Sequence, residues 1–144
     1  MPRQVSLSSG RLTIDAGFSV HIADYTDRRL QAAVSRLAER VAQQTGIPLL
    51  HGDKTVLIVE CSGGGPEYPS LSEDESYRLN ITESSARLDA PTVTGALRGI
   101  ETFLQLIAVD GQSFYVPAAR VEDRPRFAWR GFMLDVARHW MPLE

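Results

Sequence analysis

The sequence predicts an α+β fold in which one sheet of mostly antiparallel strands carries two helices packed on one face. Two segments have apolar residues at helical spacing, and several shorter segments alternate apolar and polar residues as half-buried strands do. Each helix has an apolar stripe that must be covered, and one sheet face that receives both helices would bury both stripes. The expected order is strands, helix, strands with a hairpin, helix and a short strand.

Length and composition are those of an ordinary globular protein. The chain has 144 residues, of which 43% are hydrophobic and 23% charged, so we expect one domain and the start of a second. A chain of this length buries about two-thirds of its unfolded surface and needs no disulfide or metal to fold. Cys61 is the only cysteine, so no internal disulfide is expected.

The charge of the chain argues against nucleic acid as a partner. The net charge is −3, whereas phosphate binding needs a concentrated basic face. No membrane partner is expected, because no apolar run approaches the roughly 18 residues of a membrane helix. Residues 1–5 lack the apolar core of a signal peptide. Because a shortened chain would also lack its signal peptide, the localisation stays open.

The first helix is expected between residues 27 and 46. Its apolar residues recur at spacings of four, three and four, namely Leu30, Val34, Leu37 and Val41. Thr26 or Asp27 can cap its start, Gly46 suits the position after its last turn, and Pro48 prevents continuation. We expect its arginine-rich outer face to be solvated.

The second helix follows Pro91. Its stripe and the residues that widen it are Leu97, Ile100, Leu104 and Ile107 with Val93, Ala96 and Phe103. So broad an apolar face indicates burial between two layers. Gly95 and Gly99 each lower intrinsic helicity by about 1 kcal/mol relative to alanine, so we interpret them as positions where another backbone approaches the helix closely.

The strands are expected around these helices. Residues 55–60 are β-branched and apolar enough for a central strand. Residues 77–81 and 86–90 alternate and flank Thr82-Glu83-Ser84, which predicts a hairpin with one buried face. Further strands are expected at residues 12–14 and 19–22, around a turn at 15–17. Residues 114–116 and 120–122 would add a short edge.

The first 120 residues offer little chemistry. His21, His51 and His139 are far apart and show no metal-ligand spacing, so no metal and no cofactor are predicted. Cys61 stands at the end of a strand with no base marked beside it, which favours a buried or half-buried thiol over a nucleophile. The glycines of residues 63–65 lack the context of a phosphate loop and are interpreted as a flexible connection.

Two carboxylate clusters are candidates for acid catalysis. Residues 73–75 (Glu-Asp-Glu) and 122–123 (Glu-Asp) are paired acids, which glycoside hydrolysis requires. Residues 73–75 lie among serines before the hairpin, as in a solvated loop, and no apolar pocket is evident to raise one pKa. We therefore expect neither cluster to be catalytic.

The end of the chain has a different character. Phe132-Met133-Leu134 is an unbroken apolar run that predicts a strand buried on both faces. It lies within residues 121–142, VEDRPRFAWRGFMLDVARHWMP, a segment that resembles the start of the catalytic barrel in glycoside hydrolase family 20, the β-N-acetylhexosaminidases. The residues that match the family pattern are Asp123, Pro125-Arg126-Phe127, Trp129, Arg130-Gly131, Phe132-Met133-Leu134, Asp135, Val136-Ala137, Arg138-His139 and Trp140.

A second segment carries the same resemblance. Residues 75–107 resemble the non-catalytic domain that precedes the barrel in that family, where a hairpin leads into a helix ending in Thr-x-x-Gln, here Thr102 and Gln105. The resemblance implies a non-catalytic α+β domain at residues 1–124 and the truncated start of a (β/α)8 barrel, a TIM barrel, at residues 125–144. Without its partner strands, the strand at 132–136 would fray, fold back on the domain or self-associate through its exposed edge.

The resemblance also implies an activity. Family 20 enzymes remove terminal β-linked N-acetylglucosamine or N-acetylgalactosamine with retention, using the substrate's own acetamido oxygen as the nucleophile. Their Asp-Glu pair lies on a later barrel strand and so beyond Glu144, and this chain is expected to be inactive by itself. The expected partners are β-N-acetylhexosaminide glycans, bound by the parent protein.

One substrate-binding residue follows from the resemblance. The arginine of the family's Arg-Gly pair, here Arg130, binds the hydroxyls at C3 and C4 of the terminal sugar, and a guanidinium suits two neighbouring oxygens. A structural ion pair is the alternative for Arg130. Asp135, Arg138 and His139 stand where the barrel strand ends and are candidates to support the sugar site, although a structural pair between Asp135 and Arg138 is favoured.

Two further alternatives stay open at this point. A free-standing carbohydrate-binding or protein-interaction module would need an exposed aromatic platform, but both tryptophans, Trp129 and Trp140, lie inside the barrel motif. The second alternative is a different barrel glycosidase with a similar leading domain, such as an α-glucuronidase or an O-GlcNAc-type hexosaminidase. The spacing from Trp-Arg-Gly to Arg-His favours family 20.

Overall fold

The structure is a computed structural model that describes residues 2–49, 56–68, 70–111, 113–131 and 133. Its elements in chain order are β1 (Gln4–Ile14), β2 (Val20–Asp24), α1 (Arg28–Thr45), β3 (Leu57–Cys61), β4 (Tyr77–Ile81), β5 (Ala86–Ala90), α2 (Val93–Gln105), β6 (Ala108–Asp110) and β7 (Ser113–Asp123).

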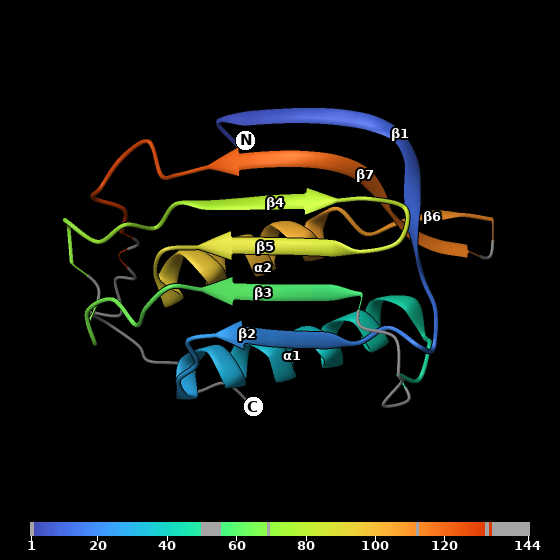
Figure 1. The fold of residues 1–144 in the computed structure, drawn as a ribbon, viewed down its shortest axis with the longest axis horizontal. Helices are drawn as coiled ribbons and strands as arrows, with labels where there is room; N and C mark the ends of the chain where they lie inside the picture. The colour runs from blue at the N-terminus through green and yellow to red at the C-terminus, as the bar shows by residue number, and fades with distance from the viewer. Residues whose placement is uncertain (1, 50–55, 69, 112, 132, 134–144) are drawn as a thin grey trace, which may run out of the picture.

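The strands form one mixed sheet with both helices on the same face. The sheet has seven strands in the order β1-β7-β4-β5-β3-β2, and β6 pairs with β7 outside this path. Pairing is parallel between β2 and β3 and between β3 and β5, and antiparallel elsewhere. Figure 1 shows α1 and α2 side by side behind the sheet. The predicted α+β class, with mostly antiparallel strands and two helices on one face, is confirmed.

Strands are confirmed on both sides of the turn at residues 15–17, as β1 and β2, which lie at opposite edges of the sheet. The expectation of a short edge at residues 114–116 and 120–122 is wrong. Both segments belong to a single strand, β7, which pairs with β1 on one side and β4 on the other and is therefore internal. This error concerns long-range pairing, which local alternation does not encode.

The predicted hairpin is confirmed residue by residue. Strands β4 and β5 pair antiparallel across the turn at 82–85. Their inward residues, Tyr77, Leu79, Ile81, Ala86, Leu88 and Ala90, are all buried. They pack against α2 and share one hydrophobic core with both helices, where Leu30, Leu37 and Val41 of α1 and Ile100 and Phe103 of α2 are at most 2% exposed.

Helix α1 begins and ends where its sequence predicts. The Asp27 side chain accepts hydrogen bonds from the backbone N–H groups of Arg29 and Leu30, at 2.9 and 3.0 Å, and so caps the first turn. Gly46 ends the helix with a φ of 68°, a left-handed conformation that favours glycine, and its N–H donates to the Ala42 carbonyl at 2.8 Å.

Helix α2 lies unusually close to the hairpin because of its two glycines. A Cβ at Gly95 would stand 2.3 Å from the backbone oxygen of Ser76, and a Cβ at Gly99 would stand 2.2 Å from Cδ1 of Leu88. Both glycines are buried. Close packing is therefore the reason for glycine at both positions, and the expected approach of another backbone is confirmed at Gly95, whereas Gly99 meets the Leu88 side chain.

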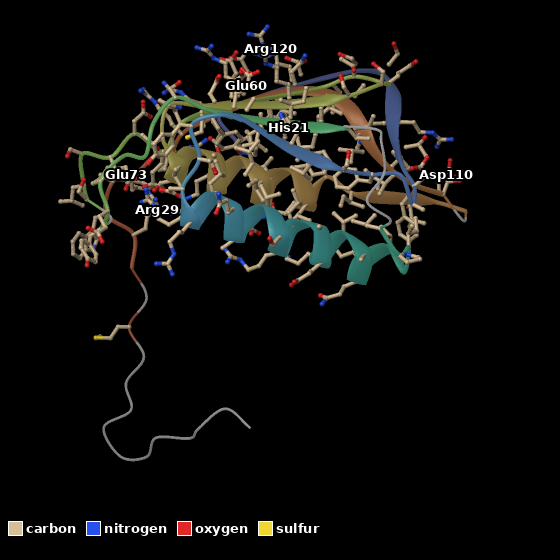
Figure 2. All side chains as sticks on the ribbon, turned by 60° about the horizontal axis from the view of Figure 1, so that its bottom comes forward. His21, Arg29, Glu60, Glu73, Asp110 and Arg120 are labelled. Carbon is tan, nitrogen blue, oxygen red and sulfur yellow. The ribbon has the colours of Figure 1, made fainter. Side chains whose placement is uncertain are left out.

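The opposite face of the sheet carries charged side chains. Register places Arg87, Asn80 and Arg120 in one row across the strands, and Glu60, Asp89, Arg78 and Glu122 in the next. Arg87 pairs with Glu60 and, at 3.1 Å, with Asp89, and Arg120 pairs with Glu122 at 2.8 Å. Figure 2 shows Glu60 and Arg120 on this face, turned away from the helices. The two rows largely neutralise each other. Among the described helices, neither is long and apolar enough to cross a membrane.

Candidate functional site

Arg130, the predicted sugar-binding residue, lies at the end of the sheet where two loops meet. The loop before β4 and the segment after β7 line a groove of about 660 Å³. The first contributes Leu71, Glu73, Asp74 and Glu75, and the second contributes residues from Arg124 to Arg130, with Arg3 beside them. A groove formed by two loops, one of which carries Arg130, is the candidate functional site.

Arg130 is paired with a carboxylate from the loop before β4. Its Nη2 donates to both oxygens of Glu75, at 2.5 and 2.6 Å, and its Nη1 donates to the Phe127 carbonyl at 2.6 Å. Glu75 also accepts a hydrogen bond from Nε of Arg98 on α2, at 2.7 Å. The Glu75 side chain is only 13% exposed, whereas the Arg130 side chain is 40% exposed. The carboxylate is therefore the fixed member of this cluster.

The expectation that residues 73–75 form a solvated acidic loop is wrong for Glu75. Two arginines cover it, one 23 and the other 55 residues along the chain. Burial alone would raise the pKa of Glu75, but the hydrogen bonds from Arg130 and Arg98 outweigh it and lower the pKa below its ordinary value. Sequence reasoning missed Glu75 because its partners are distant and no local pattern connects them.

The loop that carries Glu75 is fixed to the start of α2. Thr92 caps α2 by accepting from the Gly95 N–H at 3.1 Å, and its hydroxyl donates to the Asp74 carbonyl at 2.6 Å. The Asp74 carboxylate in turn accepts from the Ser76 N–H at 2.9 Å. Because Gly95 also packs against Ser76, the helix and the loop hold each other in place.

A second polar contact ties the end of β7 to the same region. The Tyr77 hydroxyl lies 2.6 Å from Oγ1 of Thr102 and 3.5 Å from Oδ2 of Asp123. The N–H of Arg3 donates to the other Asp123 oxygen at 2.9 Å. Burial raises the pKa of Tyr77. The threonine of the predicted Thr-x-x-Gln pattern thus bonds to the inward face of β4, close to where the segment carrying Arg130 begins.

The glycine loop after β3 is held, contrary to the expectation of a flexible connection. The Arg29 guanidinium donates to the carbonyls of Gly64 and Pro66, at 2.6 and 2.9 Å, while it pairs with Asp27 at 2.7 Å. Figure 2 shows Arg29 and Glu73 at this same end of the molecule. Glu73 has one carboxylate oxygen buried without a hydrogen-bond partner in the described part of the chain. The arginine face of α1 is therefore only partly solvated.

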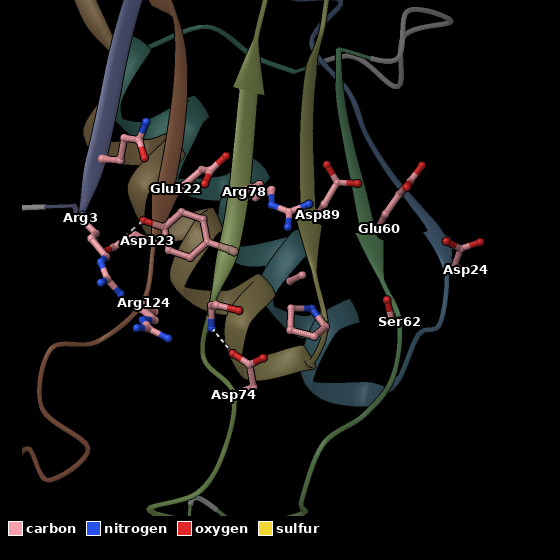
Figure 3. Close-up of a pocket in the computed structure, with 15 residues that line it drawn as sticks. Arg3, Asp24, Glu60, Ser62, Asp74, Arg78, Asp89, Glu122, Asp123 and Arg124 are labelled. Atoms are coloured by element: carbon pink, nitrogen blue, oxygen red, sulfur yellow. Dashed lines mark hydrogen bonds between the residues drawn. The ribbon is translucent and has the colours of Figure 1, made fainter.

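A larger trough opens beside the groove, on the charged face of the sheet. It has a volume of about 940 Å³, and Figure 3 shows Glu60, Asp89, Arg78 and Glu122 along it, with Asp24 at one side and Arg124 at the other. Among the described residues, Tyr77 is the only aromatic one in its lining, and these residues offer no aromatic platform for a sugar ring. Within the described residues, no group of His, Cys, Asp or Glu side chains is arranged to hold a metal.

The other residues singled out from the sequence fall into two groups. Asp135, Arg138, His139 and His51 lie outside the described residues, as does the predicted barrel strand except for Met133. Cys61 is fully buried, its thiol donates to the Gly63 carbonyl at 3.2 Å, and burial raises its pKa. The expectation of a buried or half-buried thiol is thus confirmed. His21 is exposed on the charged face of the sheet.

The Glu75 cluster predicts a specific acid sensitivity. Because the folded pKa of Glu75 is lowered, its contribution to the free energy of unfolding is complete above its unfolded pKa of about 4.3 and is lost as pH falls through the folded pKa. Thermal unfolding from pH 7 to pH 3 is expected to show a shallower decline in Glu75→Gln than in the unmodified protein. Parallel declines would mean that the pKa of Glu75 is not lowered.

Comparison with protein families gives a match over nearly the whole described domain. Residues 1–124 match the family model described as glycosyl hydrolase family 20, domain 2. Among curated proteins, the β-hexosaminidase subunit alpha of Bos taurus is 43% identical over 91 residues, which are 62% of this chain and 17% of the bovine protein. The β-hexosaminidase subunit A1 of Dictyostelium discoideum is 46% identical over 74 residues, which are 50% of this chain and 14% of that protein.

Solved structures share the fold along almost the entire chain. The chitobiase of Flavobacterium johnsoniae superposes with a TM-score of 0.91 at 36% identity, covering 98% of this chain and 22% of that one. The family 20 exo-β-N-acetylglucosaminidase of Vibrio harveyi, solved with N-acetylglucosamine, gives a TM-score of 0.75 at 27% identity, covering 99% of this chain and 21% of that one. The chain therefore spans about a sixth of the bovine relative and about a fifth of these two solved proteins.

Proposed function

The chain belongs to the domain family described as glycosyl hydrolase family 20, domain 2. On this premise we propose that it is the non-catalytic leading domain of a β-N-acetylhexosaminidase. The carrying observation is the family match over residues 1–124 together with the likeness, over 98% of the chain, to a chitobiase. The parent protein would remove terminal β-linked N-acetylglucosamine or N-acetylgalactosamine from glycans. Residues 125–144 are proposed to begin its (β/α)8 barrel.

The proposed reaction mechanism is the one used by family 20 enzymes. The substrate's acetamido oxygen attacks C1 and gives an oxazolinium ion, so no enzyme nucleophile is needed. An aspartate would orient the acetamido group and a glutamate would protonate the leaving oxygen, both on a later barrel strand of the parent. The part of the chain described here contributes support: a buried core under the helices and a loop end held by Thr92, Arg29 and Glu75.

Arg130 is proposed to bind the C3 and C4 hydroxyls of the terminal sugar. Its position supports this role, because the side chain lies at a groove and keeps 40% exposure despite its ion pair. Asp135, Arg138 and His139 are proposed to support the sugar site, with Asp135 and Arg138 paired. Self-association through the strand at 132–136 stays a prediction, since only Met133 of that strand is described.

An assay of hydrolysis tests the proposal at two levels. The parent protein is expected to hydrolyse an aryl N-acetyl-β-glucosaminide, and the purified 144-residue protein is expected to be inert because the Asp-Glu pair lies elsewhere. The reading frame after Glu144 is expected to continue for about 300 residues, the order of a (β/α)8 barrel, and to encode that pair. Hydrolysis by the 144-residue protein alone would contradict the proposal that this domain is non-catalytic. A parent protein without the activity would contradict the proposal that it is a β-N-acetylhexosaminidase.

The alternative of a free-standing binding module is not favoured. Phe127 and Trp129 are 73% and 79% exposed, but both lie in the segment after residue 124, where the barrel is proposed to begin. The reported relatives are hexosaminidases and chitobiases of far greater length. Glycan titration of the 144-residue protein separates the two cases, because a module would bind N-acetylglucosamine oligomers by itself and a supporting domain would not.

A further inference from the structure

We propose that Glu75 is a positioning residue for Arg130, through which the non-catalytic domain fixes the sugar-binding arginine of the parent protein. The inference rests on the proposed function of Arg130. The observation that carries it is the contact between both oxygens of Glu75 and Nη2 of Arg130, at 2.5 and 2.6 Å. Glu75 belongs to the sheet domain, whereas Arg130 belongs to the segment after it, so the contact joins the two parts of the chain.

The contact leaves Arg130 able to bind a sugar. A guanidinium has five N–H donors on three nitrogens, and the hydrogen bonds to Glu75 and to the Phe127 carbonyl use Nη2 and one hydrogen of Nη1. The Nε–H and one Nη1–H have no partner among the described residues. Each of these donors can bind one hydroxyl oxygen of a sugar. Glu75 therefore holds one part of the guanidinium and leaves the other available.

Glu75 is itself held rigidly enough to act in this way. Arg98 of α2 donates to it at 2.7 Å, and its side chain is 13% exposed. The loop before it is fixed by the bond from Thr92 to the Asp74 carbonyl, and the residue after it packs against Gly95. A long arginine side chain has many rotamers in water, and a fixed carboxylate selects one of them before substrate arrives.

The test compares two neutral substitutions in the full-length parent protein. Glu75→Gln removes the charge that holds Arg130. Glu101→Gln is the matched control, because Glu101 also pairs with an arginine on another element, Arg40 at 2.6 Å, but does not line the groove. With an aryl N-acetyl-β-glucosaminide, kcat/KM is expected to fall about tenfold in Glu75→Gln and to stay unchanged in Glu101→Gln. Glu75→Asp, which keeps the charge, replaces Glu75→Gln if that variant does not fold.

A second background separates positioning from a general loss of structure. In a parent that carries Arg130→Ala, Glu75→Gln is expected to cause no further fall in kcat/KM, because the residue through which it acts is gone. An equal fall in both backgrounds would overturn the proposal, as would a Glu75→Gln variant that behaves like the Glu101→Gln control.

Failure of the proposed function gives a different result. If Arg130→Ala leaves kcat/KM unchanged, the sugar-binding role of Arg130 is wrong and the positioning role falls with it. The contact is tested separately by unfolding of the 144-residue protein. Glu75→Gln and Arg130→Ala are expected to lower Tm by less in combination than the sum of their separate effects, and strict additivity would show that the two side chains do not interact.

Discussion

Replacing Gly95 with alanine is expected to lower the free energy of unfolding of the 144-residue protein by about 3 kcal/mol, or about 10 °C in Tm. In an open helix the same change would stabilise by about 1 kcal/mol, so the sign of the effect is itself informative. The new Cβ would stand 2.3 Å from the Ser76 carbonyl oxygen, and this backbone is held by β4. Either α2 or the start of β4 must move, and thermal unfolding measures the cost.

Gly99 supplies the matched comparison. A Cβ there meets Cδ1 of Leu88 at 2.2 Å, which is a side chain instead of a backbone atom. Gly99→Ala is therefore expected to cost less in a Leu88→Ala background than in the unmodified protein, whereas Gly95→Ala is expected to cost the same in both. A Gly95→Ala protein that is as stable as the original would show that the helix does not lie as close to Ser76 as described.

Replacing Arg130 with alanine in the parent protein is expected to reduce kcat/KM toward an aryl N-acetyl-β-glucosaminide about 100-fold. Each charged hydrogen bond to a substrate hydroxyl is worth about 1.5–3 kcal/mol, and a 100-fold loss corresponds to about 2.7 kcal/mol. Because the variant also frees Glu75, the assay is run well below the measured Tm of the variant. Loss of folding is then not mistaken for loss of binding.

Arg124 is the control for this substitution. It lies in the same segment and lines the same groove, but in the described part of the chain Glu75 pairs with Arg98 and Arg130 and not with Arg124. Arg124→Ala is expected to leave kcat/KM within about twofold, the size of an ordinary surface effect. Equal losses in Arg124→Ala and Arg130→Ala would indicate a general effect of positive charge at the groove, and the specific role of Arg130 would be withdrawn.

The two roles of Arg130 weighed from the sequence turn out to be compatible. A structural ion pair and a sugar contact do not exclude each other, because a guanidinium has several N–H donors. The pair with Glu75 uses one nitrogen, Nη2, and the Phe127 carbonyl takes one hydrogen of Nη1. The remaining donors are what the proposed sugar contact requires.

Local elements of the fold could be predicted closely. The first helix was placed by its stripe and by the capping residues Asp27 and Gly46, and the hairpin of β4 and β5 by strict alternation around residues 82–84. These features depend on neighbours within a few positions, where side-chain period and backbone capping act directly. The packing role of the α2 glycines is also confirmed, although another backbone approaches the helix at Gly95 only.

The order of the sheet and the partners of Glu75 could not be predicted. Strand β7 was split into two short pieces at an edge, although it lies between β1 and β4, and Glu75 was assigned to a solvated loop. Arg98 and Arg130 reach it from 23 and 55 residues away, and no spacing in the sequence records such a distance. The barrel residues Asp135, Arg138 and His139 stay predictions.

By itself the sequence determined the two helices, the central strand β3 and the hairpin of β4 and β5, with the apolar side of each, and residues 1–124 carry the match to the family to which the chain belongs. Only the tertiary structure decided which strands are neighbours and which charges meet. The physical reason is range: a hydrophobic period acts within one element, whereas an ion pair such as Glu75 with Arg130 forms only after the sheet has brought two distant loops to one end.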